Sequence, residues 1–170
     1  MVGYPFVAAL LLIAVTLVPQ PAQADEGKVV IGEVEQVMLL PWQIKFPARI
    51  DTGAAISSLD ASELSVRNDV AHFKLRNEFG EVPLKLPVVG WRNIRTSEGR
   101  ERRPLVKLDI CLGPKHLITL VTLNDRSRMT YPFLIGRTAL TGNFLVDTSQ
   151  SNAVQPQCSE GFLRTSSLSQ

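Results

Sequence analysis

One carboxylate stands between an apolar run and a glycine-containing turn in the stretch Ala48-Arg49-Ile50-Asp51-Thr52-Gly53-Ala54-Ala55. Gly53 allows a tight backbone that lets another group approach closely. The Thr52 hydroxyl can hydrogen-bond across a neighbouring loop and hold it rigid. An aspartate fixed at the end of a strand suits acid–base chemistry on a bound water. The motif is short, however, and an Asx-type turn uses the same residue types, so a purely structural turn is the alternative at this point.

Short strands are expected on both sides of this turn. Apolar residues alternate with polar ones or run together in residues 29–40, 44–50, 70–75, 81–86, 105–112, 117–123, 133–135 and 144–146. Residues 61–66 are expected to form one helical turn capped by Asp60 or Ser62, and residues 137–140 to begin a brief helix. Seven or eight short strands separated by turns predict an all-β sandwich or barrel.

A second apolar element, with a glycine and an arginine, follows at Phe133-Leu134-Ile135-Gly136-Arg137-Thr138-Ala139-Leu140. Together with the Asp-Thr-Gly-Ala turn it resembles the paired elements of the retropepsin-like aspartic proteases. The chain is similar to a bacterial branch of that superfamily labelled "putative ATP-dependent zinc protease". Further motifs of that branch match Ser97-Glu98-Gly99 with Arg103, and Leu123-Asn124-Asp125-Arg126. The resemblance spans residues 44–147 and implies an all-β, retropepsin-like closed β-barrel with one short helix.

The resemblance implies that Asp51 is the catalytic residue. In aspartic proteolysis two close carboxylates share one proton: one acts as base on the attacking water, and the other hydrogen-bonds the scissile carbonyl. The chain has one Asp-Thr-Gly sequence; its nearest imitation, Asp147-Thr148-Ser149, has serine in place of glycine and reads as a strand end. One motif per chain predicts a symmetric homodimer in which two Asp51 side chains meet on a two-fold axis.

Supporting roles follow from the same resemblance. Thr52 is expected to brace the paired loops of the dimer. Gly53 and Ala54 are expected to offer backbone groups to a peptide or protein substrate and to leave room for it. Gly136 is expected to pack close to the catalytic loop, and Arg137 to tie the short helix to the dimer.

Residues 93–103 occupy the position of the retropepsin flap, with Gly99 at a turn and with Ser97 and Arg103 as candidate substrate contacts. Five arginines lie in or beside this segment: Arg92, Arg95, Arg100, Arg102 and Arg103. A solvated hairpin with local ion pairs, each worth little, accounts for them. The alternative is a flap that favours an acidic substrate.

The label of this bacterial branch names zinc and ATP, and the sequence argues against both. A hydrolytic zinc site takes three protein ligands, usually His, Glu, Asp or Cys at close spacing. The chain has two histidines, His72 and His116, and lacks both a His-Glu-x-x-His motif and a Gly-x-x-x-x-Gly-Lys-Ser/Thr phosphate loop. His116 follows Gly-Pro-Lys in an expected turn and is interpreted as a solvated loop residue. We expect no metal and no nucleotide cofactor.

The N-terminal residues 1–24 contain no Lys, Arg, Asp or Glu, and their apolar run ends in Ala22-Gln23-Ala24. This pattern is typical of a cleaved secretory signal; an uncleaved anchor or a buried helix is the alternative. We therefore expect a signal peptide over 1–24, a retropepsin-like protease domain over 25–148 and a polar, loose C-terminal tail over 149–170. The protein is expected to be periplasmic or secreted.

The composition argues against two further classes of protein, disordered chains and nucleic-acid-binding proteins. The chain has 170 residues, of which 45% are hydrophobic and 20% charged, and this excludes a disordered chain. A formal net charge of +2 is too small to argue for nucleic-acid binding. Cys111 and Cys158 can form one disulfide in an oxidising compartment, although a buried free thiol at Cys111 is equally ordinary.

Two functions of different classes fit the sequence. The favoured one is an exported, homodimeric aspartic endopeptidase. The other is a non-catalytic domain of the cell envelope that uses the same fold to bind a peptide or a partner. Asp51, Thr52 and Gly53 together favour the enzyme, because a binding module has no need to keep all three.

Overall fold

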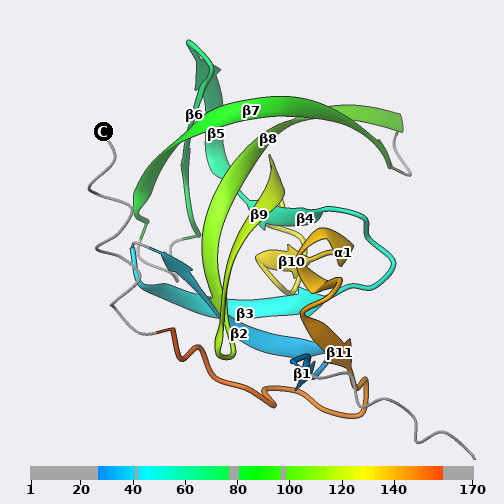
Figure 1. Cartoon of the computed structure of the whole chain (residues 1–170). Coiled ribbons are helices and arrows are strands. Elements are labelled where there is room, and N and C mark those ends of the chain that lie inside the picture. The colour runs from blue at the N-terminus through cyan, green and yellow to red at the C-terminus, as the bar shows by residue number, and fades with distance from the viewer. Residues whose placement is uncertain (1–26, 41, 77–80, 97–98, 159–170) are drawn as a thin grey trace, which may run out of the picture.

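The computed structural model describes residues 27–40, 42–76, 81–96 and 99–158, and within them the chain forms eleven strands and one short helix (Figure 1). The elements in chain order are β1 (Val29–Ile31), β2 (Val34–Leu40), β3 (Ile44–Ile50), β4 (Ser57–Asp60), β5 (Ser62–Arg67), β6 (Val70–Lys74), β7 (Pro83–Thr96), β8 (Gly99–Leu112), β9 (Lys115–Asn124), β10 (Phe133–Ile135), α1 (Arg137–Leu140) and β11 (Phe144–Val146). The all-β prediction with one brief helix is confirmed.

Six strands close into a barrel. They are hydrogen-bonded in the order β2-β3-β10-β4-β9-β8, and β8 returns to β2 through pairs from Val37↔Leu112 to Leu40↔Asp109. Phe46 and Phe133 fill the interior edge to face, with ring centroids 5.7 Å apart. The closed barrel expected from the resemblance is therefore confirmed.

Alternating side chains explain why β3 forms and which face it buries. Phe46, Ala48 and Ile50 are buried, whereas Lys45 and Arg49 are exposed. Because successive side chains of a strand point to opposite faces, this pattern directs one face of β3 into the barrel. The strand then delivers the chain to Asp51 at the barrel's end.

The parallel pairing of β10 with β3 brings two turns together that are distant in the sequence. β10 runs parallel to β3, with Phe133 opposite Ala48 and Ile135 opposite Ile50. On its other side β10 runs antiparallel to β4, with Phe133 opposite Leu59. Since β3 and β10 run in the same direction and in register, the turn after β3 and the start of α1 after β10 lie side by side.

The long hairpin of β7 and β8 curves over the barrel (Figure 1). β7 begins at Pro83, so the strand expected over 81–86 is the start of this longer strand and not a separate one. β6 and then β5 extend the sheet beyond β7. The expected turn at 77–80 lies outside the described residues.

Two further expectations are wrong in detail. Residues 62–67 form β5 in place of the helical turn expected over 61–66, because Asp60 binds Arg76 instead of capping, and the Ser62 hydroxyl donates to the Lys74 carbonyl. Residues 29–40 form two strands separated at Gly32, where a Cβ atom would lie 2.4 Å from the Gln150 carbonyl oxygen.

The segment after β11 is attached to the barrel as far as Cys158. The buried Glu35 carboxylate accepts hydrogen bonds from the backbone N–H groups of Gly32, Ala153 and Val154. Cys158 forms a disulfide with Cys111 of β8, with 5.9 Å between their Cα atoms. The expectation of a loose tail from 149 onward therefore does not hold for residues 149–158. Residues 159–170 and the expected signal peptide lie outside the described residues.

None of the helices in the described ranges is long and apolar enough to span a membrane.

Candidate active site

Asp51 is held in place by backbone groups of β10 and of its own turn. Its N–H donates to the Ile135 carbonyl at 2.9 Å, which ties it to β10. Its Oδ1 accepts hydrogen bonds from the N–H groups of Gly53 at 2.8 Å and Ala54 at 3.0 Å. The carboxylate is partly buried and has a fixed orientation at the end of β3.

Gly136 packs against the loop that carries Asp51, as expected. A Cβ atom at this position would lie 2.7 Å from the carbonyl carbon of Ile56 and 3.0 Å from the carbonyl oxygen of Ala54. The Gly136 N–H donates to the Ser57 hydroxyl at 3.1 Å. The two loops are therefore in backbone contact, which leaves no space for a side chain.

Arg137 fastens α1 to the turn that carries Asp51. Its Nη1 donates to the carbonyl oxygens of Thr52 at 2.9 Å and Gly53 at 2.7 Å. Its backbone N–H donates to the Ala54 carbonyl at 2.9 Å. A role of Arg137 across a dimer is not tested by these contacts, and neither is the bracing role of Thr52, whose side chain is exposed.

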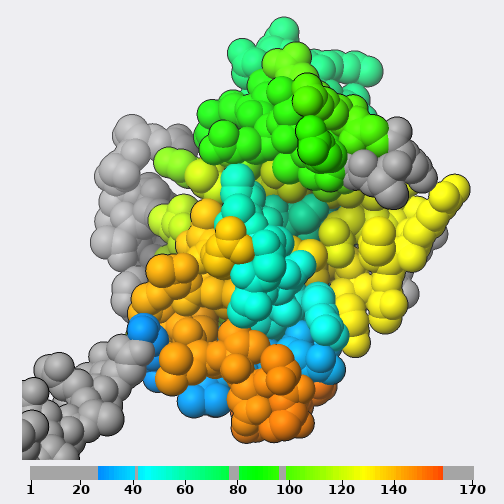
Figure 2. All heavy atoms as spheres, turned by 90° about the vertical axis from the view of Figure 1, so that its right-hand side faces the viewer, coloured from blue at the N-terminus to red at the C-terminus, as the bar shows by residue number. Residues whose placement is uncertain are grey.

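A cavity of about 290 Å³ opens beside this turn. The turn and β4, the β7–β8 hairpin, β9 with the loop after it, and β10 supply its lining: Ala54, Ala55, Ile56, Ser58, Ile94, Arg103, Thr122, Arg126 and Leu134. Figure 2 shows this side of the molecule, with the turn in cyan at the centre, the hairpin in green above it and the loop after β9 in yellow beside it. The cavity is thus positioned to hold a group next to Asp51.

Two arginines give the cavity its charge. Arg103, whose side chain is 14% exposed, donates to the Glu101 carboxylate at 2.9 and 2.6 Å. Burial lowers the pKa of the Arg126 guanidinium, the positive charge of Arg103 lowers it further, and the charges of Asp60 and Asp51 oppose this. Arg126 Nε is buried and has no hydrogen-bond partner among the described residues. Both arginines line the cavity, so an anionic group there would lie beside positively charged side chains.

The β7–β8 hairpin, which is the expected flap, contributes two residues to the cavity, and its contact with a substrate stays a prediction. Arg103 and Ile94 line the cavity from the hairpin. Gly99 lies opposite Thr96 at the outer end of the hairpin with a φ of +134°, which favours glycine. Ser97 lies outside the described residues. Arg126 has no role assigned from the sequence, where its place in Leu123-Asn124-Asp125-Arg126 is the available signal.

The Asp147 side chain is hydrogen-bonded to residues that follow it closely in the sequence, consistent with a strand end. Its Oδ1 accepts hydrogen bonds from the Ser149 N–H at 2.9 Å and hydroxyl at 2.6 Å, and its Oδ2 accepts one from Gln150 at 2.6 Å. The bonds from Ser149 hold the pKa of Asp147 below its usual range, and the bond from Gln150 adds to this.

His116 differs from its interpretation as a solvated loop residue. It lies on β9, and its Nε2 is 2.8 Å from Asp109 Oδ1. Across the described part of the chain, no group of three or more His, Cys, Asp or Glu residues is arranged to hold a metal ion.

Comparisons with known proteins agree with this geometry. The model of the RimB-like family, described as "Retropepsin-like aspartic endopeptidase RimB", matches residues 30–157. The crystal structure of a protein of unknown function from Legionella pneumophila subsp. pneumophila str. Philadelphia 1 superposes with a TM-score of 0.65 at 29% identity, covering 74% of this chain and 98% of that one.

Two curated relatives carry a different name. Proteins named "Probable alpha-L-glutamate ligase" from Parasynechococcus marenigrum (strain WH8102) and Shewanella pealeana (strain ATCC 700345 / ANG-SQ1) are 32% and 33% identical over 138 and 119 residues. These matches cover 74% and 61% of this chain, and 29% and 25% of the respective ligases. The chain therefore spans less than a third of the length of these relatives.

Proposed function

Because the chain belongs to the RimB-like family of retropepsin-like aspartic endopeptidases, we propose that two copies of it form one aspartic endopeptidase. The observation that carries the proposal is the orientation of Asp51 by the N–H groups of Gly53 and Ala54 beside a cavity. An aspartate used only to stabilise a turn has no need of a cavity next to it.

The proposed chemistry uses the Asp51 carboxylates of both subunits. Two carboxylates in contact share one proton, because like charges this close do not both ionise. The ionised one takes a proton from water as the water oxygen bonds to the scissile carbonyl carbon, and the protonated one hydrogen-bonds the carbonyl oxygen. Transfer of a proton to the departing nitrogen then allows the C–N bond to break. Neither metal nor ATP takes part in these steps.

Exposed apolar residues support a homodimer. β1 and β11 form a two-stranded parallel sheet in which Val30 lies opposite Leu145. These two side chains are 48% and 47% exposed, so the sheet presents apolar surface to solvent. Apolar surface of this kind is typical of contact sites, and a two-fold contact needs only one such patch per chain.

Arg103 and Arg126 support a substrate with acidic side chains. A carboxylate in the cavity would form charge-assisted hydrogen bonds with either guanidinium. The relatives named as glutamate ligases agree with this proposal, since their printed name concerns an acidic amino acid. We therefore propose cleavage of peptide bonds flanked by glutamate or aspartate.

Export is part of the proposal. The charge-free residues 1–24 and the Cys111–Cys158 disulfide both suit a periplasmic or secreted protein. N-terminal sequencing of the protein from an envelope fraction is expected to begin at Asp25; a chain that begins at Met1 contradicts export by cleavage.

The test of catalysis compares two aspartates. Asp51→Asn keeps the shape of the side chain and removes the base, so turnover of an acidic peptide library is expected to fall at least ~10³-fold. Asp147→Asn is the matched control and is expected to leave turnover nearly intact, with folding of both variants checked by circular dichroism. Neither the addition of chelators nor the omission of ATP is expected to change turnover. If Asp51→Asn cleaves like the unaltered chain, the non-catalytic binding domain replaces the enzyme as the proposal.

A further inference from the structure

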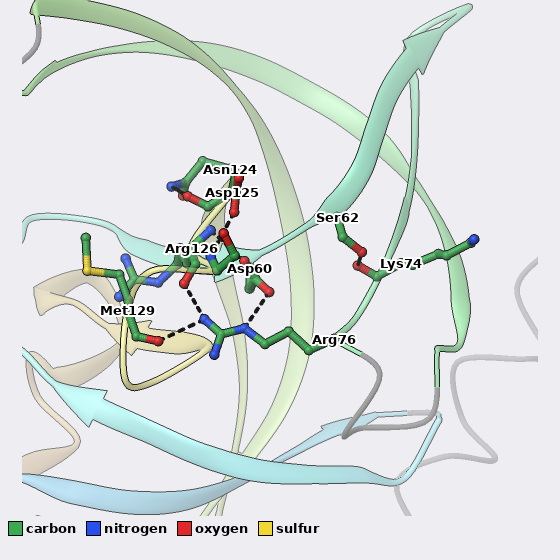
Figure 3. A network of polar contacts seen from close by, with 9 residues as sticks. Asp60, Ser62, Lys74, Arg76, Asn124, Asp125, Arg126 and Met129 are labelled. Atoms are coloured by element: carbon green, nitrogen blue, oxygen red, sulfur yellow. Dashed lines mark hydrogen bonds and ion pairs between the residues drawn. The ribbon is translucent and has the colours of Figure 1, made fainter.

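An ion pair with a buried carboxylate lies next to the backbone of Arg126, which lines the cavity (Figure 3). Asp60, at the end of β4, is 2% exposed, and its Oδ2 accepts a hydrogen bond from Arg76 Nε at 2.9 Å. Its Oδ1 accepts the backbone N–H of Arg126. Arg76 Nη2 in turn donates to the carbonyl oxygen of Arg126 and, at 3.0 Å, to that of Met129.

The ion pair therefore holds Arg126 by its backbone on both sides. Asp60 binds the N–H of this residue and Arg76 binds its carbonyl oxygen. The loop is closed further by a hydrogen bond from the Met129 N–H to the Arg126 carbonyl at 2.8 Å. At the start of the loop, the Ser58 hydroxyl donates to Asn124 Oδ1 at 2.6 Å. These contacts fix the point from which the Arg126 side chain leaves the loop.

The side chain of Arg126 leads away from this ion pair (Figure 3) and lines the cavity beside the catalytic turn. Asp60 itself is not among the residues that line the cavity, and both of its carboxylate oxygens are engaged, by Arg76 and by the Arg126 backbone. Asp60 and Arg76 thus act on the cavity only through Arg126.

We infer that Asp60 and Arg76 are positioning residues that hold the Arg126 guanidinium where it meets an acidic side chain of the substrate. The inference rests on the proposed function. Its physical reason is the balance of charge: Arg76 neutralises Asp60, so Arg126 is left to serve the cavity. Without Arg76, the unpaired buried carboxylate draws the Arg126 guanidinium toward itself and away from the substrate.

The test compares substrates within one reaction. The full chain is given an octapeptide with four central glutamates and its glutamine counterpart together, and their kcat/KM ratio is read from the two product signals. This ratio does not depend on the fraction of enzyme that is folded, so partial loss of stability does not imitate the effect. Charged hydrogen bonds of this kind change affinity by about 10-fold or more.

Arg76→Met is therefore expected to lower the glutamate preference about 10-fold or more, through KM and not kcat, and Arg126→Met to lower it as far. Lys74→Met is the matched control: it removes one positive charge nearby, but Lys74 pairs with the exposed Glu63 and points away from the network (Figure 3). This control is expected to keep the full preference. Asp60→Asn combined with Arg76→Met is expected to add little to either change alone, because both act through Arg126.

The inference fails if Arg76→Met keeps the glutamate preference of the unaltered chain, or if Arg126→Met keeps it. Binding of the same two peptides to Asp51→Asn chains with and without Arg76→Met, measured by fluorescence anisotropy, separates this failure from that of the proposed function. If the unaltered chain cleaves neither peptide, the endopeptidase proposal fails, and the binding ratio then decides the inference alone: loss of glutamate preference in Arg76→Met supports it, and an unchanged ratio overturns it.

Discussion

Replacement of Gly136 by alanine tests the contact between the two loops of the site. The backbone at Gly136 has a φ of −97°, which any residue adopts, so the substitution adds no backbone strain of its own. Its effect is steric: the added methyl group would lie 2.7 Å from the carbonyl carbon and 2.9 Å from the carbonyl oxygen of Ile56. Both atoms belong to backbone, so neither can rotate away.

The size of the effect follows from these contacts. Extra atoms forced into a packed site cost about 1–3 kcal/mol of unfolding free energy. Separation of the loops also weakens the hydrogen bond from the Gly136 N–H to Ser57, at a cost of about 1 kcal/mol. We expect Gly136→Ala to lower the free energy of unfolding by about 2–4 kcal/mol, and to lower peptide turnover because the turn that carries Asp51 shifts with the loop.

Gly90→Ala is the matched control. Its methyl group would meet only Leu105 Cδ2, at 3.9 Å, which is an ordinary contact. We expect the free energy of unfolding to change by less than about 0.5 kcal/mol. Urea unfolding, followed by tryptophan fluorescence, measures both variants. Equal midpoints and m-values for Gly136→Ala and Gly90→Ala would refute the steric argument.

Two further changes test the attached C-terminal segment and its charges. Glu35→Gln places an amide group against backbone N–H donors, so the free energy of unfolding is expected to fall by about 2–4 kcal/mol; hydrogen exchange that stays slow at residues 153–154 contradicts this. Ser149→Ala is expected to raise the pKa of Asp147, as read by NMR titration, because the hydroxyl that lowers it is removed. A lowered pKa contributes stability above the unfolded-state value and loses it as pH falls through the folded-state value, so the stability difference between the variant and the unaltered chain should be present at neutral pH and vanish in acid; a difference that grows in acid contradicts the assignment.

The parts of the fold that the sequence predicts are those in which apolar and polar residues alternate locally. β3 and the β8–β9 hairpin follow from patterns within a few residues, and both are found at or near the expected positions. β5 was mistaken for a helical turn because Asp60 is a good helix cap in isolation. Its partner, Arg76, lies sixteen residues away, and no local pattern reports that pairing.

The residues of the site also divide into those that a local motif predicts and those whose position depends on distant parts of the chain. Asp51, Gly53 and Gly136 are recognised from short motifs because the contact between the turn after β3 and the start of α1 requires those residue types. The place of Arg126 in the cavity is not recognised in this way, since four separate parts of the chain contribute to that cavity. The attachment of residues 149–158 was also missed, because a polar composition says nothing of a buried carboxylate that binds the backbone.

Mixing of subunits tests the central claim most directly, namely that one active site needs Asp51 from two chains. Unaltered chains and Asp51→Asn chains are mixed in equal amounts, dissociated, reassociated and assayed on the glutamate peptide. Random pairing leaves about one quarter of the dimers with two carboxylates, so activity is expected to fall to about 25% of that of the unaltered protein at the same total concentration. An activity of about 50% would mean that each chain works alone, and would contradict the account.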